Sequence, residues 1–302
     1  MCYSLSGTHN TNPFNAYDWY LLMKEFDAIE SYSGEQTIMQ RSFHENGKLI
    51  WMPWIGYDSN YDSVNQLMLN YLMEGATAFS IFSGKFYVNP DLTLPIRGQE
   101  MQKLMNRFKN GPAELLINSK YSRVPIAMHY SPASIKTDWI LGWDDHALAA
   151  VQGMATMLYD MGLGYDYVAY GNLETDNRLD EYKVFILPGS SSLSPKEVAS
   201  IKAFVKNGGT VIADMLPGAY DQNGKPCAVN PLLDLFGVKD IGKLIIGNAV
   251  INGTDTNLNG LTLKNYEGKL KSFSMGVIPD SGKALAKVDY QEKEYPDRKS
   301  VV

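Results

Sequence analysis

The sequence predicts an α/β protein built on parallel sheets. Short apolar runs recur along residues 2–213, and each is followed by a stretch with the 3.6-residue spacing of an amphipathic helix. A strand, a helix and a second strand joined by short connections require a right-handed parallel crossover. The run Ala76–Phe82 is almost continuously apolar, as expected for a strand that is buried on both faces.

Residues 1–119 contain four predicted βα units. One helix is expected to begin after Asp62 or Ser63 and to end before Gly75, and another to run from about Gly98 to its end at Gly111 and Pro112. Four units are half of a (β/α)8 barrel, and a bare half would expose two sheet edges. We therefore expect residues 1–119 to form the last four βα units of such a barrel, in a chain that is part of a longer protein. The expected strands are Cys2–Ser6, Ala28–Tyr32, Leu49–Trp54 and Ala76–Phe82.

Residues 120–245 are predicted to form a doubly wound domain, and residues 246–302 the start of a small β domain. Ser194 and Glu197 have the spacing of a capping box around Pro195, which marks the start of a helix. Ser131–Trp143 is expected to be a loop, and Lys283–Tyr290 to be strand-like without an obvious partner. The expected strands of the doubly wound domain are Val124–Tyr130, Tyr165–Ala169, Lys183–Leu187 and Thr210–Ala213.

The composition argues against several classes of partner. The chain has 302 residues, 45% of them hydrophobic, with a net charge of -6 and no basic stripe, so nucleic acid is not an expected ligand. Its apolar runs are too short for a membrane helix. Cys2 and Cys227 show neither metal-ligand spacing nor a disulfide framework. As written, the chain is predicted to be cytoplasmic, or secreted or periplasmic if a signal precedes it.

Several catalytic motifs are missing. A glutaminase needs a cysteine thiolate on a strand-to-helix elbow, and neither cysteine lies on one. The sequence has no glycine-rich phosphate loop. The histidines are not spaced as zinc ligands, so neither a cofactor nor a metal is expected; they are His9, His44, His129 and His146.

Carboxylates and aromatic residues gather where the predicted strands of the first segment end. The carboxyl ends of parallel barrel strands carry active sites, and hydrolysis of a glycoside needs two carboxylates. Glu30 and Asp58 are the predicted catalytic residues, with Glu35 in the loop between them as a further carboxylate; the alternative is that each is a solvated or structural group. Aromatic faces can stack on sugar rings. The predicted substrate-binding residues are His9, Trp19, Tyr32, Trp54, Tyr57 and Phe82.

The middle of the chain carries short sequence motifs that are specific in combination. They are HYSPAS at 129–134, YKVFILP at 182–188, FVKNGGTVIADMLPG at 204–218 and LLDLFGV at 232–238. Together they resemble the trimerisation domain of family 42 β-galactosidases, which has a fold like that of class I glutamine amidotransferases. The resemblance covers Val124 to Val238 and implies a catalytic barrel before this domain and a small β domain after it.

The resemblance implies a glycoside hydrolase of β-galactosidase type that acts on terminal β-glycosides through two carboxylates. The acid/base glutamate of the family would lie upstream of Met1, and the nucleophile would fall within Met52–Asp58, where this sequence has no Glu. Either Asp58 or Glu30 acts as the nucleophile, or the protein is a noncatalytic assembly or glycan-binding protein. The resemblance also implies a homotrimer formed through the middle domain. The aromatic loop Asp138–Asp145 either reaches a cleft with Trp139 and Trp143, or these tryptophans pack under the loop.

Overall fold

The computed structural model divides into two compact units. The first comprises Met1–Pro132, Met154–Ile186 and Gly208–Thr210, and the second comprises Ala133–Gly153, Leu187–Asn207 and Val211–Val302. The residues that the structure describes are 2–4, 17–31, 34–44, 50–55, 60–82, 84–119, 122, 124–143, 146–175, 178–241, 243–253, 256–258, 261–263, 267–275, 277–282 and 288–291.

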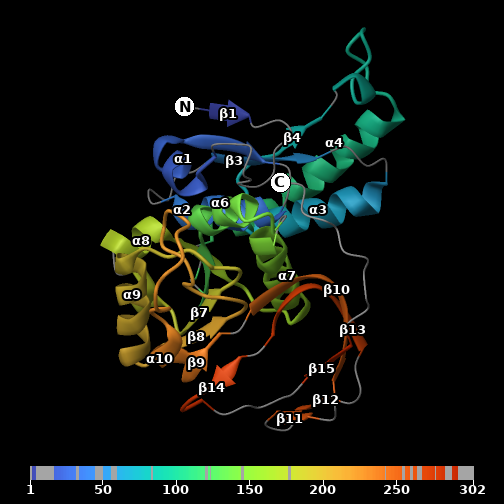
Figure 1. Cartoon of the computed structure of the whole chain (residues 1–302). Helices are drawn as coiled ribbons and strands as arrows, with labels where there is room; N and C mark the ends of the chain where they lie inside the picture. The colour runs from blue at the N-terminus through green and yellow to red at the C-terminus, as the bar shows by residue number, and fades with distance from the viewer. Residues whose placement is uncertain are drawn as a thin grey trace. The chain divides into compact units, whose positions relative to one another are not determined.

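The first unit begins with a parallel sheet in the order β1-β2-β3-β4 (Figure 1). Its strands are β1 (Cys2–Ser4), β2 (Ala28–Ser31), β3 (Ile50–Ile55) and β4 (Ser80–Ile81). The parallel α/β architecture predicted for this segment is confirmed, whereas membership of a closed barrel stays a prediction. The predicted strand Ala76–Phe82 is shortened to Ser80–Ile81. Before it, Ala76 N donates to Tyr71 O of the preceding helix, and the amides of Thr77 and Ala78 both donate to Trp51 O of β3.

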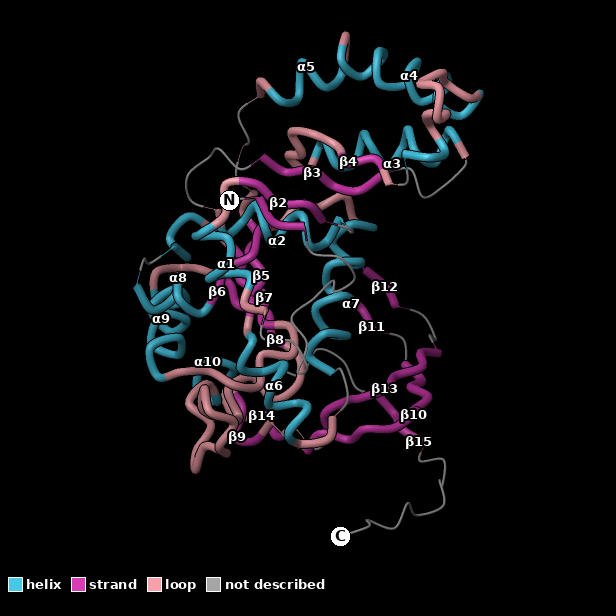
Figure 2. Tube along the Cα trace, turned by 90° about the horizontal axis from the view of Figure 1, so that it is seen from above, coloured by secondary structure: helices cyan, strands magenta, loops and turns pink. Residues whose placement is uncertain are grey.

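The helices of this segment follow the predicted order with two short additions. They are α1 (Trp19–Glu25), α2 (Gly34–Phe43), α3 (Tyr61–Met73), η1 (Gly84–Phe86), α4 (Ile96–Lys109) and α5 (Pro112–Ile117). Helix α3 contacts β3, α4 and α5 (Figure 2). Gly111 and Pro112 end α4 as predicted, but Pro112 also occupies the first turn of α5, where its missing amide donor costs nothing.

The second parallel sheet has the strand order β6-β5-β7-β8. Its strands are β5 (Ile126–Tyr130), β6 (Asp166–Ala169), β7 (Val184–Leu187) and β8 (Thr210–Ala213). In chain order this is 2-1-3-4, the arrangement of flavodoxin-like doubly wound folds. Thr210 N donates to Lys183 O where β8 begins beside the start of β7.

The helices around this sheet confirm one local prediction and correct another. They are α6 (Pro132–Ile140), α7 (His146–Asp160), α8 (Tyr170–Thr175), η2 (Arg178–Glu181) and α9 (Pro195–Lys206). Ser194 and Glu197 close the predicted capping box at the start of α9. The expected loop Ser131–Trp143 is wrong, because most of it is α6, which starts at Pro132 in the position that tolerates proline.

Within the first unit, α2 packs on the second sheet. Ser42 Oγ accepts a 2.8 Å hydrogen bond from Tyr167 N of β6, 125 residues further along the chain. The Phe43 ring lies 5.1 Å from the ring of Tyr130 and 6.4 Å from that of Tyr167. Both residues of this helix are buried, so α2 joins residues 34–43 to the sheet that follows residue 125.

A buried ionic cluster lies beside this contact. Arg41 Nη2 lies 3.0 Å from Asp166 Oδ1, and Arg41 Nη1 donates to Glu74 O at 2.9 Å. Burial raises the pKa of the Glu74 carboxyl from 4.5 to about 7, against the opposing effect of the nearby Arg41. A raised pKa in the folded state stabilises the fold at low pH, and this contribution disappears as the pH rises through about 7.

The variant Glu74→Gln is therefore expected to be more stable than wild type at pH 8 and to differ little from it near pH 4.5. The pKa shift converts to at most about 3 kcal/mol, and we expect about 2 kcal/mol because part of the side chain reaches solvent. Urea unfolding at both pH values measures the difference, with Glu114→Gln on the exposed face of α5 as the control. A Glu74→Gln variant that gains nothing at pH 8 would contradict this interpretation.

The rest of the second unit is mainly antiparallel. Its elements are α10 (Leu233–Phe236), β9 (Val238–Asp240), β10 (Lys243–Gly253), β11 (Thr256–Leu258), β12 (Leu261–Leu263), β13 (Glu267–Met275), β14 (Ile278–Pro279) and β15 (Val288–Gln291). The expectation that Lys283–Tyr290 lacks a partner is wrong, because β15 pairs with β10 in the sheet β13-β10-β15. In the described part of the chain, no helix combines the length and apolarity needed to cross a membrane.

Candidate active site

One face of the first sheet is partly open and carries a carboxylate. Along β3, Trp51 and Ile55 are buried, whereas Met52 and Trp54 between them are half-buried, because successive side chains point to opposite faces. The register places Glu30 beside Met52 and Ser80 beside Trp54. Residues in register point to the same side of a sheet, so Glu30, Met52, Trp54 and Ser80 share the half-buried face.

The opposite face of the same sheet is closed. Trp51 packs edge-on against Tyr71 of α3, with ring centroids 6.3 Å apart. Ile29, next to Glu30 in the chain, is fully buried. The helix therefore covers the Trp51 face, and the accessible chemistry of this sheet lies on the Glu30 face.

Glu30 is held in place by a hydrogen bond that spans the sheet. Ser80 Oγ of β4 donates to Glu30 Oε1 of β2 at 2.8 Å, passing over β3. Trp54 and Phe82 lie at the carboxyl end of the same face with their rings 6.1 Å apart in an edge-on arrangement, and Phe82 is 42% exposed. A fixed carboxylate beside an exposed aromatic surface can exchange a proton with, or attack, a ligand whose apolar ring face stacks on these side chains.

The structure brings together three of the predicted site residues, Glu30, Trp54 and Phe82. Trp19 is 1% exposed at the start of α1, and its backbone amide donates a hydrogen bond to the hydroxyl of Tyr130. Its buried side chain therefore does not reach this face. Glu35 belongs to α2 and not to the predicted loop. Four other predicted residues lie outside the described part of the chain, so their roles stay predictions: His9, Tyr32, Tyr57 and Asp58.

A second group of polar side chains is buried in the second unit. Asp138 of α6 is 1% exposed, and its Oδ2 accepts from the amide of Ala147 at 2.5 Å and lies 3.2 Å from His146 Nδ1. Asp138 thus satisfies an amide in the first turn of α7. Gly189 N donates to Asp214 Oδ1 at 2.6 Å, and burial raises the pKa of the Asp214 carboxyl.

The turn that follows β7 could not carry an ordinary side chain at its second residue. Gly189 has φ of 54°, and a Cβ atom there would lie 2.6 Å from the Cα of Ala147.

Cys227 lies elsewhere in this unit, and burial raises the pKa of its thiol, which opposes nucleophilic activation. Among the residues that the structure describes, no three His, Cys, Asp or Glu side chains form a group that could hold a metal.

These features define an α/β protein with two parallel sheets, one of which presents a carboxylate and aromatic rings on a half-buried face. Residues 150–297 match the family model of the beta-galactosidase trimerisation domain. This match confirms the resemblance inferred from the sequence of the middle region.

Solved structures of beta-galactosidases have the same fold. A beta-galactosidase from Rahnella sp. R3 superposes with a TM-score of 0.73 at 15% identity, over 90% of this chain and 46% of that one. The beta-galactosidase from Bacillus circulans sp. alkalophilus gives 0.71 at 13% identity, over 90% and 45%. Gan42B, a GH42 beta-galactosidase, gives 0.68 at 13% identity, over 97% and 48%.

The likeness at this identity establishes the fold. The chain spans about half the length of these beta-galactosidases. No curated protein matches the sequence.

Proposed function

We propose that the chain is part of a glycoside hydrolase of β-galactosidase type that hydrolyses terminal β-glycosides through carboxylates. The observation that carries the proposal is the Glu30 carboxylate, which Ser80 holds on the partly open face of the first sheet. The fold shared with GH42 enzymes supports a barrel in which this face is turned inwards. A division at residues 119 and 245 into barrel half, trimerisation domain and β domain is part of the same proposal.

In this proposal Glu30 supplies one of the two carboxylates of the reaction. The hydrogen bond from Ser80 occupies Glu30 Oε1, so Oε2 is the oxygen proposed to face the sugar. Because the carboxylate is already held in one orientation, the reaction does not bear the entropic cost of orienting it. Asp58, which follows β3 in the sequence, is proposed as the second carboxylate within this chain. A separation of roughly 5–5.5 Å between the two would give a retaining reaction, and a separation of roughly 6.5–9.5 Å an inverting one.

The aromatic residues at the carboxyl ends of the strands would bind the sugar. The rings of Trp54 and Phe82 are inclined at 76° to each other, so one can lie under a sugar ring while the other contacts its edge. His9, Tyr32 and Tyr57 are proposed to complete this surface, with hydroxyl and imidazole groups for the sugar hydroxyls.

A noncatalytic glycan-binding or assembly protein is the second candidate. It is favoured by the segment Met52–Asp58, which has no Glu although the family resemblance places the nucleophile there. The same Ser80 hydrogen bond would then keep Glu30 as a sugar-hydroxyl acceptor instead of a reacting group.

Turnover separates the two functions. The full-length parent protein is incubated with a chromogenic β-galactoside, and its binding of galactose is measured by calorimetry. Release of the aglycone supports the hydrolase. A measurable affinity for galactose without release supports the glycan-binding protein, and the absence of both overturns both.

We further propose that the parent assembles as a trimer through the trimerisation domain. At the end of α6, Trp139 is 53% exposed and is followed by the exposed Ile140, an apolar surface of the kind that interfaces cover. Trp143 packs instead on His146 and Tyr220, with ring centroids 6.2 and 5.6 Å away. Sedimentation of the intact parent should give a trimer, and Trp139→Ser should shift it towards smaller species; a monomeric wild type would refute the assembly.

A further inference from the structure

A cluster of hydrogen-bond acceptors lies in the second unit, where β7 and β8 end. This acceptor cluster consists of Asp138, His146 and Asp214. Asp138 belongs to α6, His146 begins α7, and Asp214 directly follows β8. Ligands of doubly wound folds bind beyond the carboxyl ends of the parallel strands, so the cluster lies at the end of the sheet where a ligand site is expected.

Two touching backbone segments hold the carboxylates of Asp138 and Asp214 near each other. Asp138 Oδ2 accepts from Ala147 N, and Asp214 Oδ1 accepts from Gly189 N at 2.6 Å. Ala147 and Gly189 are in contact, because a Cβ atom on Gly189 would lie 2.6 Å from Ala147 Cα. Burial raises the pKa of the Asp214 carboxyl, and among the smaller effects His146 lowers it and Asp138 raises it. Asp138 and His146 therefore lie within electrostatic reach of Asp214.

Two buried acceptors of the cluster have no partner in the described part of the chain. These are Asp138 Oδ1 and His146 Nε2, on side chains that are 1% and 3% exposed. His146 Nδ1 lies 3.2 Å from Asp138 Oδ2, and a carboxylate only accepts, so Nδ1 carries the proton and Nε2 of the neutral ring keeps its lone pair. Burying acceptors without donors is unfavourable, so a ligand that donates to them gains free energy.

Two aromatic rings flank the cluster on its accessible side. Trp143 packs edge-on against His146 and Tyr220, with ring centroids 6.2 and 5.6 Å apart. Burial, and secondly the charge of Asp138, raise the pKa of the Tyr220 hydroxyl, so this ring also lies near the cluster. Trp143, Tyr220 and Asp214 are half-buried, so the cluster is reached from their side. The faces of indole and phenol rings attract cations.

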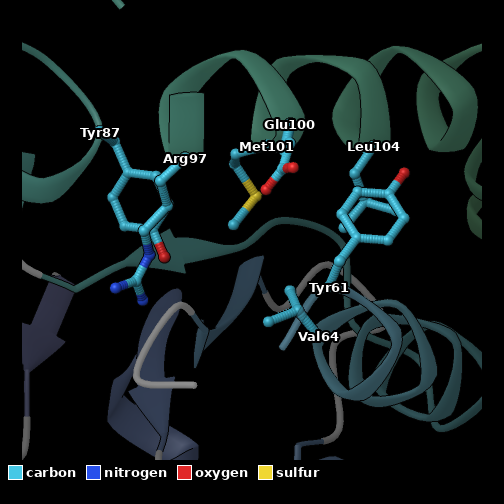
Figure 3. A pocket seen from close by; sticks show the side chains of 7 residues that line it. All are labelled: Tyr61, Val64, Tyr87, Arg97, Glu100, Met101 and Leu104. Atoms are coloured by element: carbon cyan, nitrogen blue, oxygen red, sulfur yellow. The ribbon is translucent and has the colours of Figure 1, made fainter. Parts of the chain in front are cut away.

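The space between α3 and α4 in the first unit is of another kind. Figure 3 shows Met101 and Leu104 of α4 above Val64 of α3. These three side chains are buried and apolar. The space is a gap in the packing of two helices, and we assign no ligand to it.

We infer that the acceptor cluster binds the ammonium group of a small primary amine. An ammonium group carries three donors and a positive charge, which match two carboxylates and the lone pair of a neutral imidazole. It is about the size of a water molecule, and its alkyl chain would lie between Trp143 and Tyr220. An anion would be repelled by both carboxylates, and the described residues form no group of three His, Cys, Asp or Glu that could hold a metal. The inference goes beyond the proposed hydrolysis and does not depend on it.

The test is a titration of the full-length parent with ethylammonium chloride at pH 7.5, followed by saturation-transfer NMR of the probe. We expect saturable binding with a Kd in the millimolar range, the limit for so few atoms. Asp214→Asn keeps an acceptor for Gly189 N but removes the charge, and should raise the Kd at least tenfold. Asp160→Asn, at an exposed position at the end of α7, should leave the Kd unchanged.

The controls decide which property of the probe is recognised. Ethanol has a similar size without the charge and should not bind, and sodium chloride at the same concentration should not displace the amine. Equal binding of ethanol, displacement by sodium, an unchanged Kd in Asp214→Asn or no saturable binding to the wild type would each overturn the inference. If Asp214→Asn does not fold, Trp143→Leu carries the test, with a Kd raised about threefold or more through the lost ring contact.

Discussion

Replacing Glu30 by glutamine should lower kcat/KM of the full-length parent for a chromogenic β-galactoside by roughly 100- to 10,000-fold, the range for a lost acid, base or nucleophile. Glutamine keeps the shape of the side chain and can still accept the hydrogen bond from Ser80 Oγ, so the effect isolates the charge. The measurement is steady-state release of the aglycone, with unchanged circular dichroism and unfolding midpoint as evidence that the variant is folded.

Two comparisons sharpen this test. Glu25→Gln changes an exposed carboxylate at the end of α1 and should leave kcat/KM unaltered. Ser80→Ala removes the hydrogen bond that positions Glu30 and should lower kcat/KM by less, on the order of tenfold. If Glu30→Gln retains wild-type turnover, another carboxylate is the catalytic group, and Asp58→Asn would then be examined.

The largest expected effect on stability comes from Asp138→Ala. This change removes the acceptor of the Ala147 amide and the partner of His146 Nδ1 in a place that is closed to solvent. Buried donors that lose their partners cost about 1–3 kcal/mol each, so the free energy of unfolding should fall by about 3–4 kcal/mol. Urea denaturation followed by tryptophan fluorescence measures the loss, and Trp143 beside His146 is a suitable reporter.

Matched variants distinguish this role from a general loss of charge. Asp138→Asn keeps one acceptor oxygen for Ala147 N, so about half of the stability should return. Asp160→Ala removes an exposed carboxylate at the end of α7 and should change stability by less than about 0.5 kcal/mol. A small effect of Asp138→Ala, comparable to that of Asp160→Ala, would show that the cluster does not hold α7 in place.

The parts of the structure that depend on local sequence could be predicted. The capping box at Ser194 involves residues three apart, and the alternation along β3 places Trp54 on the open face with no knowledge of the rest of the chain. The position of Glu30 near the end of a short apolar strand is a local signal of the same kind. These signals are local, and the structure agrees with each of them.

The parts that depend on distant partners could not be predicted. Ser80 binds Glu30 across 50 residues, and a serine in an apolar run gives no sign of such a partner. The prediction of Trp19 at a strand end is wrong because the Asp18 side chain accepts from the amides of Tyr20 and Leu21 and starts a helix that buries Trp19. The acceptor role of Asp138 likewise became visible only when the start of α7 was brought beside α6.

The packing of α2 on β6 has a consequence for synthesis on the ribosome. Ser42 and Arg41 bind partners 125 residues further along the chain, and Phe43 contacts two rings of the later sheet. At roughly 5–20 residues per second, those partners are translated about 6–25 s after α2. During that interval Phe43 can pack on Tyr20 of α1, which is made earlier, but the contacts of α2 with the later sheet must wait, and their formation is a slow, long-range step of folding.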